Sequence, residues 1–150
     1  MEKKQIGVLA VQGAFAEHIA MVRRLGAEAF EIRQLPDLER PMDGLILPGG
    51  ESTAMRKLLD ELGLYEPLRA KIAAGLPVYP TADSMVRDGG LATVGINYTV
   101  LGGQTADMVC RVLEGTPIAD IPVELLNESS VVVNGDTAAA LGVDVSRYVQ

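Results

Sequence analysis

Four residues, Gly49, Gly50, Glu51 and Ser52, stand between a short apolar run and a segment with helical spacing. The first backbone N–H groups of a helix have no partner within the helix, and glycine allows a ligand to approach them closely. Such a turn can hold an oxyanion or a small anion. A tight turn followed by a helix cap explains the same residues without a ligand, so both interpretations stay open at this point.

Polar side chains also follow the other apolar runs of the chain. They are Gln12, Thr81, Asp83, Ser84 and Asn97. The carboxyl ends of parallel strands meet at one edge of a sheet, and open α/β sheets bind their ligands there. Together with the turn at 49–52, these residues therefore predict a polar crevice. A solvated rim of loops that binds nothing is the alternative.

Hydrolysis of an amide by a cysteine needs a thiolate and a histidine base. The chain has one cysteine, Cys110, and one histidine, His18. Helical spacing places Cys110 on an inward face, as expected of a core thiol, and His18 at the edge of a buried face. One cysteine forms neither an internal disulfide nor a CxxC zinc site, and no glycine-rich nucleotide motif is present. We therefore expect no metal and no cofactor.

Alternating apolar and amphipathic segments must position these residues. Strands are expected at 6–11, 29–32, 44–47, 77–79 and 91–96. Helices are expected at 14–25, 52–62, 65–74, 81–87 and 99–113, the last with Ala106, Val109, Cys110 and Leu113 facing inward. This alternation predicts an α/β fold: a doubly wound, flavodoxin-like, five-stranded parallel sheet in the order 2-1-3-4-5 with helices on both faces. The tail adds strand-like pieces at 121–125 and 131–133 and a helix at 136–141.

Length and charge limit the class of protein. The 150 residues fit one α/β domain spanning 1–150. The net charge is −7, and the chain has no cluster of Lys and Arg of the kind that binding to nucleic acid or an anionic membrane requires. The chain shows no signal peptide, so a cytoplasmic location is expected. We expect no partner, and leave open self-association through the C-terminal strand, because the packing of residues 116–150 cannot be derived from their pattern.

The first half carries a specific motif. The runs Ile6–Gly13 and Asp43–Thr53, with Glu17 and His18 between them, resemble the glutaminase subunit of pyridoxal 5′-phosphate synthase over about residues 5–79. The resemblance implies glutamine hydrolysis, an oxyanion hole that includes Gly49 and Gly50, and a synthase partner that meets the region of His18. It also implies a cysteine nucleophile after the fourth strand, where this chain has Ala82.

The second half resembles a different family. Residues 76–84, 89–98, Leu101, Gly102 and Gln104–Ala106 are similar to the C-terminal part of an ABC-transporter substrate-binding protein of the tryptophan-binding type, over about residues 75–150. We therefore expect an engineered chimera, with a glutaminase-like half at 1–76 and a binding-protein-like half at 77–150.

The resulting prediction is an engineered scaffold without catalytic activity, and not an enzyme, because Ala82 occupies the nucleophile position and the family's histidine and glutamate partners are absent. The first alternative is a small-molecule or anion binding module at the switch point of the sheet. The second is a remnant glutamine amidotransferase.

Overall fold

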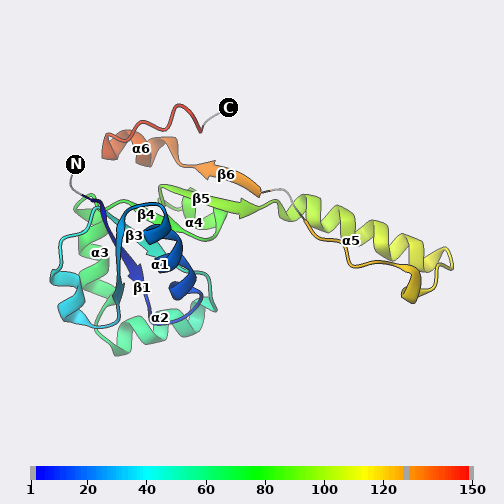
Figure 1. Cartoon of the computed structure of the whole chain (residues 1–150), viewed down its shortest axis with the longest axis horizontal. Coiled ribbons are helices and arrows are strands. Elements are labelled where there is room, and N and C mark those ends of the chain that lie inside the picture. Colours follow the sequence, from blue (N-terminus) through cyan, green and yellow to red (C-terminus); the bar gives the residue numbers. More distant parts are fainter. Residues whose placement is uncertain (1–2, 127–128, 149–150) are drawn as a thin grey trace.

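A computed structural model describes residues 3–126 and 129–148. Residues 1–2 of the first expected half, and residues 127–128 and 149–150 of the second, lie outside the described residues. The chain forms an α/β body at its N-terminal end, and from this body a two-stranded ribbon and a long helix extend to one side (Figure 1). The chain then returns along the ribbon and ends beside the body with a short helix.

The body is built on a parallel sheet of four strands in the order β2-β1-β3-β4. The strands are β1 (Gln5–Leu9), β2 (Glu28–Ile32), β3 (Gly44–Leu47) and β4 (Val78–Pro80). Val8 of β1 is paired with Ile46 of β3, which is paired in turn with Tyr79 of β4. Residues paired in this way share a face of the sheet. The expected order is therefore confirmed for its first four strands.

Helices cover the two faces of this sheet unequally. On one face α1 (Phe15–Arg24) packs over β1 and β2, with Ile19 against Val8 and Ala29. The other face has a larger core, in which Leu9, Leu45 and Val78 meet side chains of three elements. These elements are the 3-10 helix η1 (Leu35–Glu39), α2 (Ser52–Glu61) and α3 (Tyr65–Ala73).

The fifth strand departs from the expected fold. β5 (Ala92–Ile96) pairs antiparallel with β6 (Ser129–Val133) in a separate two-stranded sheet, so the order 2-1-3-4-5 is not what the structure shows. Leu91, the residue before β5, lies beside β4 and donates its N–H to the Val78 carbonyl at 2.8 Å. β6 is in register with all five residues of β5, whereas β5 forms no ladder with β4.

The helix after β5 was expected to face inward, and this is wrong. Every residue of α5 (Tyr98–Leu113) is exposed or half-buried, and Cys110 is exposed rather than a core thiol. Because β5 leads away from the body, α5 has no sheet beneath it (Figure 1). The chain turns through η2 (Ile118–Asp120) and returns along α5, where Arg111 and Glu124 form an ion pair. The return at 121–125 is not a strand.

Two side chains of the tail, those of Asn134 and Thr137, donate hydrogen bonds to carbonyls of the body. Asn134 lies between β6 and α6 (Gly135–Leu141), and its side-chain amide donates to the Val86 carbonyl of α4 (Asp83–Arg87) at 2.8 Å. Its Oδ1 accepts from the Thr137 N–H at 3.0 Å.

Among the described residues, no helix is long and apolar enough to cross a membrane.

Replacing Asn134 by alanine is expected to lower the free energy of unfolding by about 1–3 kcal/mol, because it removes two hydrogen bonds and leaves a partly buried carbonyl without its donor. Urea unfolding followed by circular dichroism measures this change. Asn97→Ala is the matched control, since Asn97 caps α5 with two local hydrogen bonds but reaches no other element. An equal loss for both variants would contradict a tethering role for Asn134.

Candidate functional site

Loops from three strands converge at the carboxyl edge of the body. Gly13, after β1, has φ +84°, and a Cβ at this position would lie 2.0 Å from the Gly49 carbonyl oxygen. A Cβ on Gly49 would in turn lie 3.1 Å from Thr81 Oγ1, after β4. The three loops therefore approach one another more closely than side chains would allow.

The Gln12 side chain connects the first two of these loops. A Cβ on Gly50 would lie 3.2 Å from Gln12 Cδ, so the amide lies directly over this turn. In the amide orientation that satisfies both groups, Gln12 donates to the Glu51 carbonyl at 3.2 Å and accepts from the Glu51 N–H at 3.3 Å. Gln12 thus holds the β3–α2 turn in place.

The start of α2 is capped by a carboxylate of the chain itself. Glu51 accepts from the Thr53 N–H at 2.9 Å and from the Ala54 N–H at 2.5 Å, one bond to each carboxylate oxygen. These two backbone donors, that of Thr53 first, hold the pKa of the Glu51 carboxyl below its usual value. Ser52 is the first residue of the helix and is exposed. The donors expected to face an anion are therefore already bonded to Glu51.

This cap makes part of the stability dependent on pH. Because the folded pKa of Glu51 is lowered, its contribution is present above its unfolded pKa of about 4.3 and is lost as pH falls through the folded pKa. Glu51→Gln should therefore destabilise the chain more at pH 7 than at pH 3, as measured by urea unfolding at both values. Glu61→Gln, at the exposed end of the same helix, is the control for loss of an acidic side chain from α2. Equal losses for Glu51→Gln at the two pH values would contradict this role.

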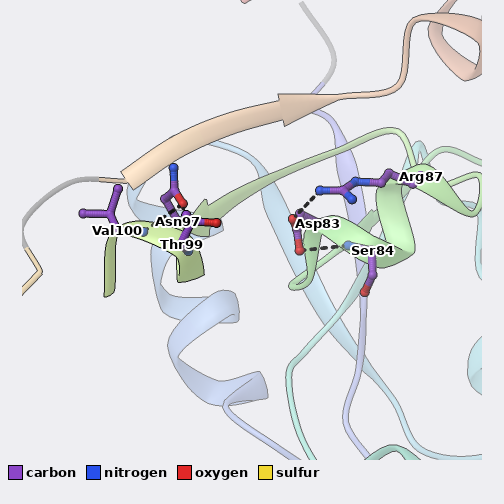
Figure 2. Close-up of polar contacts among 6 residues, drawn as sticks. All are labelled: Asp83, Ser84, Arg87, Asn97, Thr99 and Val100. Atoms are coloured by element: carbon purple, nitrogen blue, oxygen red, sulfur yellow. Dashed lines mark hydrogen bonds and ion pairs between the residues drawn. The ribbon is translucent and has the colours of Figure 1, made fainter. Parts of the chain in front are cut away.

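The turn after β4 has its own internal network (Figure 2). Asp83 accepts from the Ser84 N–H at 2.9 Å and from the Arg87 guanidinium at 2.9 Å, within α4. Ala82, at the position where the glutaminase resemblance places a nucleophile, is the N-cap residue of α4 and has an extended backbone. Thr81 lies against Gly49 of the β3–α2 turn, and Ala82 and Asp83 follow it in the chain.

Asn97 does not join this group. Its Oδ1 accepts from the Thr99 and Val100 N–H groups at 3.0 and 3.3 Å, which caps α5 at the far end of β5 (Figure 2). Because β5 leaves the main sheet, its carboxyl end no longer lies beside the carboxyl end of β4. The sequence analysis placed Asn97 at the shared edge only because it expected β5 to be the fifth strand of the main sheet.

The two groups relevant to cysteine chemistry lie on different elements. His18 is half-buried on α1, and Cys110 is exposed on α5. Within the described part of the chain, no three or more His, Cys, Asp or Glu side chains gather as metal ligands.

A concavity that the sequence did not indicate lies at the opposite, amino-terminal edge of the sheet. Its volume is 490 Å³, and Arg40, Met42, Lys71 and Leu76 are among its lining residues. They belong to the segments that lead into β3 and β4, where neither motif nor spacing marked them.

Comparison with known proteins divides the chain into two overlapping parts. Residues 8–93 match the SNO glutamine amidotransferase family, and residues 68–150 match a family described as ABC transporter substrate binding protein. Both matches include residues 68–93, which contain β4 and α4. Two families therefore share one continuous sheet.

Two similar curated proteins are subunits of pyridoxal 5′-phosphate synthase. The pyridoxal 5′-phosphate synthase subunit PdxT of Methanocorpusculum labreanum is 61% identical over 82 residues, which is 55% of this chain and 43% of the relative. PdxT of Desulfitobacterium hafniense is 54% identical over 82 residues, 55% of this chain and 41% of the relative. The chain thus spans less than half the length of these relatives.

Solved structures resemble nearly the whole chain. An ABC domain from Streptococcus pneumoniae in complex with L-Trp aligns with a TM-score of 0.65 at 25% identity, covering 95% of this chain and 52% of that one. The ligand-free, open structure of a substrate binding protein with adhesive properties from Clostridium difficile gives 0.64 at 25% identity, with 94% and 50% covered. The extended arrangement of Figure 1 therefore corresponds to about half of a binding-protein chain.

These comparisons correct the prediction that the chain is not an enzyme. That prediction rested on Ala82 and on the missing histidine and glutamate, whereas the matched family consists of glutamine amidotransferases and the relatives are subunits of pyridoxal 5′-phosphate synthase. Each family profile covers more than half of the chain. The chain therefore belongs to the SNO glutamine amidotransferase family through residues 8–93 and to the ABC transporter substrate binding protein family through residues 68–150.

Proposed function

We propose that the chain binds a free amino acid at the carboxyl edge of its four-stranded sheet. The observation that carries this proposal is the convergence of Gly13, Gly49 and Thr81, where three loops meet with no room for larger residues. Both families point to the same ligand class: one is named for glutamine, and a solved relative of the other holds L-Trp.

The side chains at this edge suit an amino acid. Every free amino acid carries an ammonium group, and a carboxylate oxygen has two lone-pair positions. Glu51 uses one hydrogen bond on each oxygen for its cap, so each oxygen keeps a position for a further donor. Asp83 supplies a second carboxylate, and the Gln12 amide adds polar atoms that can recognise a side-chain amide.

Calorimetric titration with L-glutamine and L-tryptophan tests this proposal. At least one of them should bind saturably, and Glu51→Gln should weaken that binding about tenfold or more, because a hydrogen bond to a charged group contributes about 1.5–3 kcal/mol. Glu61→Gln, on the same helix but away from the edge, should bind as the native chain does. No heat of binding with either amino acid, or equal loss for both variants, would contradict the proposal.

Glutamine hydrolysis is a second candidate function. The observation that favours it is the match of residues 8–93, which include the Gly49–Gly50 turn, to the SNO glutamine amidotransferase family, together with 61% identity to a PdxT subunit over 82 residues. This function predicts sustained release of ammonium from L-glutamine above a blank without protein. Heat-denatured chain at the same concentration controls for contaminating ammonium, and release that does not exceed this control would rule the function out.

We further propose that the chain is an engineered chimera that folds as one domain, with its seam close to residues 76 and 77. The support is the overlap of the two family matches around β4, together with the packing of Val78 in one core with Leu45 and Leu68. Because β4 hydrogen-bonds to β3, residues 1–76 expressed alone lose an edge of their sheet and should show no cooperative thermal transition by circular dichroism. A cooperative transition in either isolated half would contradict the single domain.

A further inference from the structure

One face of the four-stranded sheet is only half covered. On the side where α1 packs, the helix lies over β1 and β2, and Ile46 of β3 packs against the edge of the same core, whereas no residue of β4 belongs to it. Ile46 and Tyr79, which are neighbours in register, are half-buried and 37% exposed respectively. The Tyr79 ring lies over Gly44, where a Cβ would be 3.2 Å from it. Among the described residues, no helix of this core packs over Tyr79, so the β4 end of the face is left partly exposed.

The chain also carries a helix without a surface to cover. The face of α5 formed by Ala106, Val109, Cys110 and Leu113 has the spacing of a helix that packs on a sheet. Val109 is nevertheless 51% exposed and Leu113 is 81% exposed. A helix of this length rises about 24 Å, and it points away from its own sheet (Figure 1).

The total surface shows how much is left uncovered. The accessible surface is 10017 Å², whereas a compact monomer of 15.9 kDa exposes about 7,400 Å². The excess of about 2,600 Å² is larger than the roughly 800 Å² that each partner contributes to a standard interface. The extended form therefore exposes enough surface for a stable dimer.

We propose that two copies of the chain exchange α5, so that the Ala106–Leu113 face of each helix covers Ile46 and Tyr79 on the sheet of the other copy. The exposed face of α5 and the exposed part of the sheet belong to the same chain. A dimer with two-fold symmetry therefore covers both surfaces in each copy. A foreign partner would have to supply both a helix and a sheet to achieve the same. The contact supplies the helix layer that a doubly wound sheet needs on this face.

Light scattering after gel filtration gives the first test. The native chain should have twice the monomer mass of 15.9 kDa. Val109→Glu with Leu113→Glu places charges in the contact and should give a monomer at the same concentration. Leu35→Glu is the matched control: Leu35 is 47% exposed on η1, at the opposite face of the sheet, and this variant should remain a dimer. A native chain that is monomeric at all concentrations would overturn the proposal.

Oxidative cross-linking tests which surfaces meet. Cys110 is the only cysteine, so a variant with Tyr79→Cys contains one thiol on each proposed surface. Mild oxidation should give a dimer on a non-reducing gel that disappears when Cys110→Ala is added to the variant. A disulfide within one monomer would show that α5 closes on its own sheet. A dimer that forms equally in the native chain would show that the two α5 helices pair with each other. Either result would overturn the proposed exchange.

Discussion

Gly13→Ala is expected to lower the free energy of unfolding by roughly 2–5 kcal/mol. Gly13 has φ +84°, a conformation that costs a residue with a Cβ about 1–2 kcal/mol. The new Cβ would also lie 2.0 Å from the Gly49 carbonyl oxygen, so two loops must separate, and overpacking of this kind costs about 1–3 kcal/mol. Urea unfolding measures the loss. Binding of amino acids at this edge should weaken in the same variant, because the β1 and β3 loops move apart.

Gly26→Ala is the matched control for this substitution. Gly26 has φ +88°, close to that of Gly13, but a Cβ there would meet nothing within 4 Å. This variant should lose only the backbone cost of about 1–2 kcal/mol. The difference between the two variants therefore isolates the contact between the loops, and equal losses would show that Gly13 and Gly49 do not approach closely in solution.

Leu45→Ala should cost about 2–5 kcal/mol. Leu45 is fully buried in β3, within the larger core that Leu9, Leu68 and Val78 share. Truncation removes apolar contacts with Leu9, Leu68 and Val78 and leaves a cavity among them. Thermal unfolding followed by circular dichroism should show a lower midpoint with a single transition.

Leu25→Ala provides the comparison for this loss. Leu25 is 79% exposed at the end of α1, and its truncation should change the stability by no more than about 0.5 kcal/mol. If Leu45→Ala were as mild as this control, the core on the α2–α3 side would not be the main source of stability.

The sequence was sufficient to predict the sheet as far as β4. Its strands are short apolar runs, each with a glycine or proline at its end or within four residues of it, and parallel strands joined by helices leave few alternative orders. β5 could not be placed in the same way, because Ala92–Ile96 forms a ladder with whichever neighbour offers an edge. The competing edge was β6, which lies far away in the sequence.

α5 shows a second limit of predictions made from the spacing of apolar residues. The spacing of Val109, Cys110 and Leu113 predicted the helix correctly, but it says only that one face is apolar. Whether that face is covered depends on where the preceding strand leads. Cys110 was therefore expected in the core and lies exposed.

The candidate site was predictable in part for the same reason. Gln12, Gly49 and Thr81 follow strands of one parallel sheet and come together, as their position after those strands indicated. Asn97 follows β5 and is separated from them. The capping bonds of Glu51 depend on its rotamer, which no sequence pattern specifies.

Amide chemical-shift mapping by NMR tests the central claim, that an amino acid binds at the carboxyl edge of the sheet, most directly. Titration of the ¹⁵N-labelled chain with L-glutamine, and separately with L-tryptophan, should shift the amide signals of the three converging loops with at least one of the two. The reporters are Gln12, Gly13, Gly49, Gly50, Glu51, Thr81 and Asp83. Shifts confined to Arg40, Met42, Lys71 and Leu76, around the concavity at the amino-terminal edge, or no shifts with either amino acid, would contradict it.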